Sequence, residues 1–212
     1  MLGPSDLGER CEFCLGEKIL IVQKGTSRLS VRRRFSYAAW VGTAIHEKLD
    51  RAMGALEAEV FTLRELTLMI ANIPALGDVW GHTDCYVPDW GEVIDYKTKL
   101  DKEAVYKLLH QEELARTEGT LDPRLEKMWD QTMLYGLGVE RSGKPVEAVS
   151  LVILPRYSDD IGEIKTVTRR YDRDRALGVI DRVAKTAEKL RIFGVTSLAI
   201  GSDCYTCQNL RM

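Results

Sequence analysis

The stretch GHTDCYVPDWGEVIDYKTK, residues 81–99, places two aspartates and a lysine in a segment that otherwise has the pattern of a buried β-hairpin. Pro88-Asp89-Trp90-Gly91 forms its turn signal. A turn centred between Asp89 and Trp90 puts Asp84 directly opposite Asp95, with Cβ atoms about 5 Å apart. Lys97 then shares their face, opposite His82, because side chains alternate along a strand.

Two adjacent carboxylates repel each other, so one of them must take up a proton or a cation must lie between them. Mg²⁺ or Mn²⁺ fits this role because hard cations bind carboxylate oxygens and keep open positions for water. The alternative is an Asp95–Lys97 ion pair on a solvated face. A bulge or a longer turn would change the pairing of Asp84 with Asp95, but it would leave Asp95 and Lys97 on one face.

These residues resemble motifs of the PD-(D/E)XK nuclease superfamily, in particular its RecB-like branch. GHTD is similar to the Gly-x-x-Asp motif of that branch, and IDYK is similar to its (D/E)-x-K motif. GTAIHEKLD resembles the preceding Gly-x-x-x-His element and supplies His46. QTMLY matches Gln-x-x-x-Tyr and supplies Gln131 and Tyr135, which share one helix face. Each pattern is weak alone, but all four occur in the order typical of the family.

The resemblance implies metal-dependent hydrolysis of phosphodiester bonds. Lys97 would orient the attacking water or offset charge on the phosphate, and Gln131 and Tyr135 would support the site or position the strand. An imidazole among the ligands shifts the preference towards Mn²⁺ over Mg²⁺. The cation ligands implied in this way are His46, Asp84, Asp95 and the backbone carbonyl of Tyr96.

Cysteine spacing suggests a second metal site. Of the five cysteines, Cys11 and Cys14 form one CxxC pair near the start, and Cys204 and Cys207 form another near the end. The two pairs make a four-thiolate site if the ends of the chain meet in space. Cys85 neighbours Asp84 on the opposite face of the strand, which indicates a core residue.

The paired cysteines resemble the iron–sulfur RecB-like nucleases, which include the CRISPR-associated exonucleases of the Cas-four type. The resemblance implies a [4Fe-4S] cluster outside the catalytic core. This chain departs from the commonest family pattern of one early and three late cysteines, because its cysteines divide two and two. Structural Zn²⁺ is the main competitor, since two CxxC pairs are equally typical of zinc sites.

The family implies an α/β fold with a restriction-endonuclease-like core, in which helices flank a mixed central sheet. We expect one RecB-like nuclease domain over 1–212, with the catalytic core at 36–156. Segments 1–35 and 190–212 together would form the cysteine-ligated region that joins the two ends of the chain. The length of 212 residues suits a single domain.

Periodicity and capping signals predict the elements. Segment 62–73 is either a short helix or a strand plus turn. The last residues, 194–212, have the composition of a loop. Helices are expected over 36–61, 101–117, 122–137 and 173–193, a hairpin over 78–99, and a buried strand over 146–155.

The formal net charge of −2 gives no overall electrostatic case for nucleic acid. A local basic strip at 24–34 nevertheless contains Arg32, Arg33 and Arg34, which together with Lys99 are candidates for phosphate contacts. Trp40, Trp80 and Trp129 could stack on bases, but core packing is the favoured interpretation of each. His82 is expected to be a partly exposed structural residue, and His110 to be inert.

The sequence contains no signal-peptide pattern and no apolar stretch long enough to span a bilayer, which favours a cytoplasmic location without membrane association. The leading hypothesis is an iron–sulfur exonuclease acting on single-stranded DNA, either phage-encoded or linked to CRISPR systems, with a homo-oligomer or recombination or CRISPR proteins as partners. The alternatives are a zinc-stapled endonuclease and a non-catalytic DNA-binding adaptor with the same fold.

Overall fold

A mixed five-stranded sheet with the order β1-β2-β3-β4-β5 forms the centre of the computed structural model. Its strands are β1 (Leu63–Ile73), β2 (Gly77–Val87), β3 (Glu92–Asp101), β4 (Ala148–Tyr157) and β5 (Lys165–Arg170). β3 and β4 are parallel, and the other neighbouring pairs are antiparallel. The structure describes residues 2–25, 37–55, 61–120, 122–158, 160–201, 204, 207 and 208, without the side chains of 37–40, 50 and 52–55.

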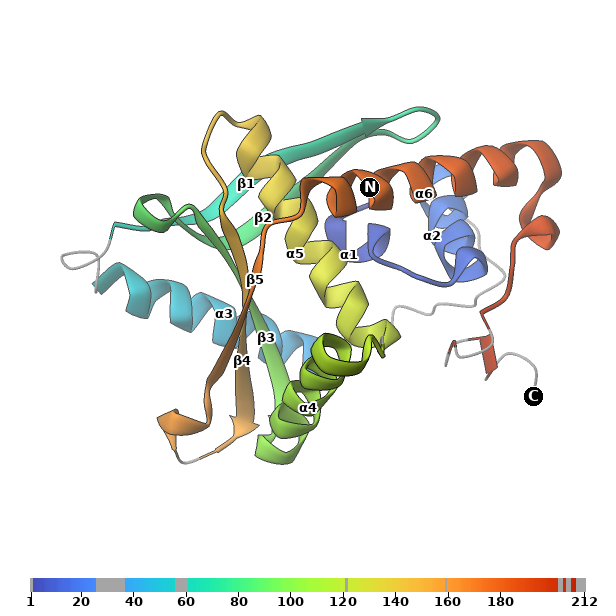
Figure 1. The fold of residues 1–212 in the computed structure, drawn as a ribbon. Coiled ribbons are helices and arrows are strands. Elements are labelled where there is room, and N and C mark those ends of the chain that lie inside the picture. The colour runs from blue at the N-terminus through green and yellow to red at the C-terminus, as the bar shows by residue number, and fades with distance from the viewer. Residues whose placement is uncertain are drawn as a thin grey trace.

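Helices cover both faces of this sheet (Figure 1). The main core packs α5 (Pro123–Arg141) against inward residues such as Val93 on β3 and Leu151 on β4. Tyr96 and Leu154 alternate with these residues and point to the other face, where Leu49 of α3 (Tyr37–Ala55) meets them. The predicted alternation along β3 therefore separates two faces that are both covered.

A layer of helices extends beyond the sheet and contains both ends of the described chain (Figure 1). It consists of α1 (Pro4–Leu7), α2 (Glu12–Lys24) and α6 (Arg173–Phe193), and α4 (Lys102–Glu118) packs beside β3 and β4. After α6 the chain turns back towards α2, where Leu198 packs over Gly16. This return brings the end of the chain to its beginning.

The helices predicted at 122–137 and 173–193 correspond to α5 and α6, and the expected Asp122 cap accepts hydrogen bonds from the Arg124 and Leu125 amides. Segment 62–73, left open between helix and strand, is β1. The helix predicted over 36–61 ends at Ala55 among the described residues, and Phe61 lies outside it, so that prediction was too long. α1, α2 and β5 were not predicted. None of the described helices combines the length and apolar character needed to cross a bilayer.

Candidate active site

The register between β2 and β3 agrees with the predicted hairpin. Cys85 pairs with Ile94 and Tyr86 with Val93, so the next position places Asp84 opposite Asp95. The backbone ladder ends at the Cys85–Ile94 pair, and the Tyr96 amide donates to Oδ2 of Asp84 at 2.6 Å. The Asp84 carboxylate therefore takes the place of a backbone acceptor where the strands begin to separate.

His46 comes to this carboxylate from α3. Its Nδ1 lies 3.3 Å from Oδ1 of Asp84, and its ring meets the edge of Tyr96 with centroids 5.9 Å apart. The hydrogen bond with Asp84 raises the pKa of His46 above its usual value, despite the opposing effect of burial. The helix predicted around GTAIH thus delivers the imidazole to the first aspartate of the hairpin.

Asp95 is the most enclosed member of the site, with 2% of its surface exposed. Lys97 Nζ lies 2.6 Å from its Oδ2, and the Thr132 hydroxyl donates to the same oxygen at 3.3 Å. Burial raises the pKa of Asp95, the Lys97 charge opposes the rise, and the Asp84 charge adds to it. Both of these contacts among the described residues use Oδ2, so Oδ1 is the oxygen that can take a further ligand.

Gln131 and Tyr135 continue the site along α5. Gln131 Oε1 accepts a hydrogen bond from Lys97 Nζ at 3.1 Å, and its Nε2 donates to the Tyr135 hydroxyl at 2.9 Å. Burial raises the pKa of Tyr135, so its hydroxyl stays protonated. The chain Asp95–Lys97–Gln131–Tyr135 holds the ammonium from two sides.

The glycine of the GHTD motif has a packing role. A Cβ on Gly81 would lie 2.6 Å from Cγ of Pro4 and 3.1 Å from Cε1 of Tyr135. Only the absence of a side chain allows α1 and α5 to approach β2 this closely. The motif glycine therefore fixes a helix–strand distance one residue before His82 and three residues before Asp84.

A cavity of about 500 Å³ opens beside His46 and Asp84. Glu65 lines it and was missed by the sequence analysis. Arg64 pairs with Cys85 and Leu66 with Thr83, so Glu65 stands opposite Asp84, with a positive φ of 49°. Finding Glu65 required the register of β1 with β2, and the sequence did not decide whether segment 62–73 is a helix or a strand. The other lining residues are Thr43, Glu47, Arg51 and His82.

The donors suit a hard divalent cation by their chemistry, which combines two carboxylates with one imidazole. They are not drawn together as a finished ligand set: among the residues described, the group whose ligand atoms all lie within 4.8 Å of one another is made of cysteines. Asp95 is held by Lys97 and Thr132 instead. The Tyr96 carbonyl belongs to the residue that follows Asp95 on β3.

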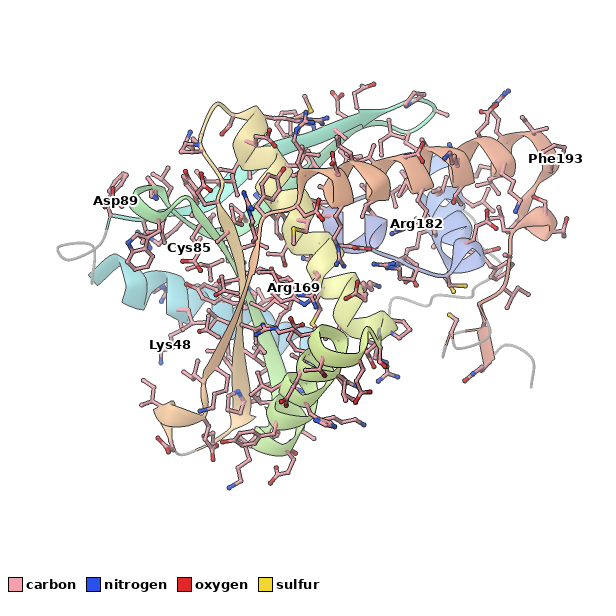
Figure 2. The ribbon with its side chains drawn as sticks, viewed as in Figure 1. Lys48, Cys85, Asp89, Arg169, Arg182 and Phe193 are labelled. Carbon is pink, nitrogen blue, oxygen red and sulfur yellow. The ribbon has the colours of Figure 1, made fainter. Side chains whose placement is uncertain are left out.

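The four paired cysteines meet, although nearly the whole chain separates them. Cys14 Sγ lies 3.4 Å from Cys207 Sγ and 3.5 Å from Cys204 Sγ, and Cys11 Sγ lies 3.5 Å from Cys207 Sγ. The Gly201 amide points at Cys11 Sγ from 3.4 Å. Cys85 is buried in the smaller core beside α3, as predicted (Figure 2). A converging four-thiolate site is therefore present.

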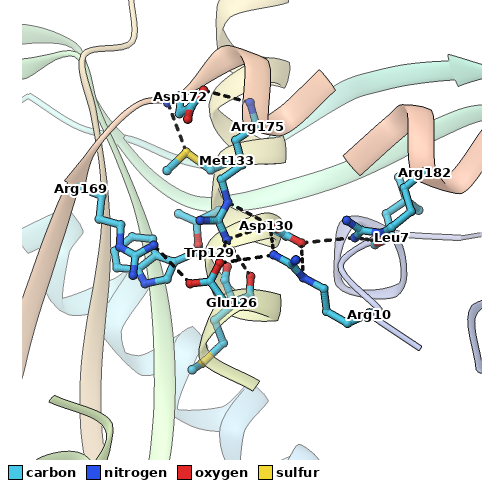
Figure 3. Close-up of polar contacts among 12 residues, drawn as sticks. Leu7, Arg10, Glu126, Trp129, Asp130, Met133, Arg169, Asp172, Arg175 and Arg182 are labelled. Carbon is cyan, nitrogen blue, oxygen red and sulfur yellow. Dashed lines mark hydrogen bonds and ion pairs between the residues drawn. The ribbon is translucent and has the colours of Figure 1, made fainter. Parts of the chain in front are cut away.

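A group of ion pairs around two buried carboxylates lies between this cysteine site and α5 (Figure 3). Asp130 and Glu126 project from α5 and are each less than 5% exposed. Arg10, next to Cys11, contacts both carboxylates. The remaining ion pairs come from β5 and α6, through Arg169, Arg175 and Arg182.

Of the four predicted nucleic-acid contacts, Lys99 lies among the described residues. Arg32, Arg33 and Arg34 lie outside the described residues. Lys99 is on β3, partly buried, with Nζ 3.9 Å from Met128 Sδ.

Among the tryptophans, Trp129 is fully buried, as expected, and its indole N–H donates to Glu112. The core interpretation of Trp80 was wrong: 42% of this residue is exposed, because it lies on a side of β2 that none of the described elements covers. The Trp40 side chain lies outside the described residues. His82 is exposed and bonded to Thr67, and His110 is exposed on α4.

Comparison with known proteins gives matches at the level of structure. No protein-family model matches the sequence, and no curated protein matches it either. A crystal structure of SSO0001 matches 100% of this chain and 85% of its own, with 16% identity and a TM-score of 0.56. The alkaline exonuclease LHK-Exo from Laribacter hongkongensis matches 90% of this chain and 87% of its own, with 13% identity and a TM-score of 0.55.

A phage-related exonuclease from Haemophilus somnus 129PT matches 93% of this chain and 83% of its own, with 14% identity and a TM-score of 0.52. LHK-Exo also matches in a complex with dAMP, with 15% identity and a TM-score of 0.51. Identities this low establish a shared fold and nothing finer. The chain has the mixed α/β fold of these exonucleases, with helices on both faces of its sheet and four cysteines clustered between its N- and C-terminal segments.

Proposed function

We propose that the protein is a metal-dependent DNA nuclease of the PD-(D/E)XK type, acting as an exonuclease on single-stranded DNA. The observation that carries the proposal is the arrangement of two contacting pairs on a fold shared with exonucleases: His46 with Asp84, which line the cavity, and Asp95 with Lys97 on the neighbouring strand. The four side chains come from a helix and two strands, so their convergence depends on the whole fold.

The proposed cation ligands are His46, Asp84 and Asp95, with the Tyr96 carbonyl as a fourth. Mg²⁺ or Mn²⁺ bound there would lower the pKa of a water molecule and offset charge on the scissile phosphate. Asp84 is already oriented by the Tyr96 amide, and His46 is oriented by Asp84. Asp95 offers Oδ1 while its Oδ2 stays on Lys97 and Thr132.

Lys97 is the group proposed to act on the reacting atoms. Its ammonium is fixed between Asp95 and Gln131. It is therefore preorganised to donate a hydrogen bond to the attacking water or to a phosphate oxygen. Gln131 and Tyr135 are positioning residues because they act through Lys97. Lys99, further along β3, is the proposed phosphate contact among the described residues, and Arg32, Arg33 and Arg34 complete the proposed DNA-binding set.

Hydrolysis of 5′-labelled linear single-stranded DNA in Mn²⁺ tests the proposal. Asp95→Asn and Lys97→Met should each lower the rate by at least about a hundredfold, as expected when a group that stabilises the transition state is lost. Asp181→Asn, at an exposed position on α6, is the matched control and should keep full activity. An exonuclease leaves a covalently closed circle intact, whereas an endonuclease cuts it.

Wild-type protein that binds but never cleaves DNA would support the adaptor alternative instead. If both the linear and the closed substrates are cut, the endonuclease alternative replaces the exonuclease.

The cysteine site is proposed to hold a metal centre outside the active site. The family resemblance favours [4Fe-4S], but the sulfur separations of 3.4–3.5 Å favour a single tetrahedral ion. Zn–S bonds of about 2.3 Å give sulfurs just under 4 Å apart, whereas a four-iron cluster needs its ligand sulfurs further apart because the irons stand between them. Metal analysis and the visible spectrum of protein purified without oxygen decide between the two: iron with a brown colour supports the cluster, and one zinc per chain supports the ion.

A further inference from the structure

The β1–β2 ladder has one side that no described element covers. Along β2 the burial alternates, with Val79, Gly81 and Thr83 buried and the positions between them open. Along β1 the same alternation leaves every second side chain open from Glu65 to Met69. We call this surface the open face; its residues are Glu65, Thr67, Met69, Trp80, His82 and Asp84.

These six residues form three cross-strand pairs. Met69 pairs with Trp80 and Thr67 with His82, and Glu65 stands opposite Asp84. The open face thus runs from an apolar pair, through a polar pair, to an acidic pair at the candidate active site. The Thr67 hydroxyl lies 3.1 Å from Nδ1 of His82, which fixes the imidazole between the two ends.

The open face is continuous with the cavity of the candidate active site. Glu65, His82 and Asp84 line that cavity together with His46. Trp80 lies four residues from Asp84 on the same strand, or about 13 Å at the usual rise of a strand. A chain whose scissile phosphate sits between Asp84 and Asp95 therefore reaches Trp80 with its next few nucleotides.

The chemistry of the Trp80 end suits a nucleobase. Trp80 and Met69 are exposed by 42% and 41%, and together they offer one indole and one thioether. Two side chains are too few for a stable protein interface, which takes about 20–30 residues a side, but one flat indole is enough to stack on a base. Aromatic side chains bind single strands by stacking on bases, and they do so without sequence preference because every base has a π-face. Paired duplex bases are already stacked on each other and cannot use such a platform.

We propose that Trp80, backed by Met69, is a stacking platform for an unpaired base of the nucleic-acid substrate, a few nucleotides from the scissile phosphate. The proposal rests on the proposed function and adds the feature that selects single strands. His82 would contact the sugar–phosphate chain between the platform and the cation site. Trp90 provides a matched control, because it is 58% exposed in the turn at the other end of β2.

The test measures binding of a fluorescent oligothymidylate in Ca²⁺, which holds the substrate without supporting cleavage, for wild type, Trp80→Ala, Trp80→Phe and Trp90→Ala. Trp80→Ala should weaken binding about tenfold or more, as expected from the loss of one stacked base. Trp80→Phe should stay within about threefold of wild type, because it keeps an aromatic face. Trp90→Ala should bind like wild type.

An abasic oligonucleotide of the same length separates stacking from phosphate contacts. Wild type and Trp80→Ala should bind it equally weakly. Equal affinity of wild type and Trp80→Ala for oligothymidylate would overturn the platform, as would an equal loss of affinity for both oligonucleotides.

A small activated phosphodiester, hydrolysed in Mn²⁺, separates this inference from the proposed function. Trp80→Ala should hydrolyse it at the wild-type rate, because a small diester does not reach the platform. Wild-type protein that fails to hydrolyse the diester counts against the nuclease itself. Wild-type protein that hydrolyses it while Trp80→Ala binds oligothymidylate normally counts against the platform alone.

Discussion

Arg10 and Asp130 form an ion pair between the cysteine site and the candidate active site, with the carboxylate buried and the guanidinium partly exposed. Arg10 Nε lies 2.9 Å from Oδ2 of Asp130, and its Nη2 lies 2.9 Å from Oδ1. Arg10 precedes Cys11 in the sequence, and Asp130 precedes Gln131, which holds Lys97. The pair therefore connects the end of the four-cysteine site to the helix that orients the active-site ammonium.

Asp130→Asn should lower the free energy of unfolding by about 2 kcal/mol, because three partly exposed guanidinium groups lose the buried carboxylate that they share. Asp130 is 1% exposed and also receives Arg175 and Arg182, so little water can replace the lost carboxylate. Urea denaturation of the two proteins measures the difference. Asp181→Asn removes an exposed carboxylate paired with Lys185 and should change stability by less than about 0.5 kcal/mol. A similar small effect at both positions would contradict a stabilising role for the buried Asp130 carboxylate.

Two glycine-to-alanine substitutions should have opposite effects. At Gly81 the new methyl group would overlap Pro4 and crowd Tyr135, so we expect a loss of about 1–3 kcal/mol in stability. At Gly178, an exposed position in α6 with no atom within 4 Å of the added Cβ, alanine should raise stability by up to about 1 kcal/mol through its better helix propensity. Thermal unfolding of both variants tests the pair. Equal melting temperatures would mean that β2 can move away from α1.

The active-site hairpin could be predicted because its information is local. Pro88 and Gly91 fix the turn, the turn fixes the register, and the register brings Asp84 opposite Asp95. His46, Gln131 and Tyr135 were found through motif spacing, since the sequence does not say which face of the sheet each helix covers. The spacing of the two CxxC pairs predicted a shared site. The fold then brings the two ends of the chain together, which the sequence could not show.

The features that were missed depend on contacts between distant segments. Glu65 joins the site only because β1 is a strand in a particular register with β2, and that segment has no decisive periodicity of its own. Trp80 looks like a core residue by type, but no described helix covers its side of the β1–β2 ladder. The Arg10–Asp130 pair joins residues 120 positions apart, and no local pattern indicates it.

Lys99 should show a pH-dependent cost to stability. Burial lowers its pKa below 10.5, and the nearby Lys97 charge lowers it further, so the protonated form is disfavoured in the folded protein. The loss of stability is full at pH values below the pKa of Lys99 in the folded protein. It declines as pH rises from that pKa to 10.5, the usual lysine value, and is absent above 10.5. Lys99→Met should therefore be more stable than wild type at pH 7, by less than about 1 kcal/mol, with the difference shrinking towards pH 10.5.

The same variant should bind single-stranded DNA less tightly at pH 7 if Lys99 contacts a phosphate, with a smaller dependence of affinity on salt concentration. Chemical denaturation across the pH range and binding at two salt concentrations measure the two effects separately. A variant that is less stable than wild type at pH 7 would mean that the Lys99 ammonium is favourably paired in the fold.

Removal of the proposed metal from the cysteine site should release the segment after α6 without unfolding the sheet. Beyond Gly194 the described chain is held by the Leu198 contact with Gly16, by the Ala199 amide bonded to Glu12, and by the cysteines. The sheet core has no thiolate ligand, and its one cysteine, Cys85, packs beside Leu49. Cys207→Ser or exhaustive chelation should thus expose 194–208 to proteolysis while the far-ultraviolet circular dichroism changes little.

Cys85→Ala is the matched control for this experiment, because it removes a buried thiol that lies outside the cysteine site. It should keep the full metal content and remain resistant to cleavage after Gly194. The two cysteine pairs close a loop of nearly the whole chain, so the released protein should also unfold at a lower temperature, by the entropy that the loop removed from the unfolded state. Cleavage that begins within the sheet after chelation would mean instead that the metal centre also stabilises the core. The Arg10–Asp130 ion pair would then be the contact that connects the cysteine site to α5.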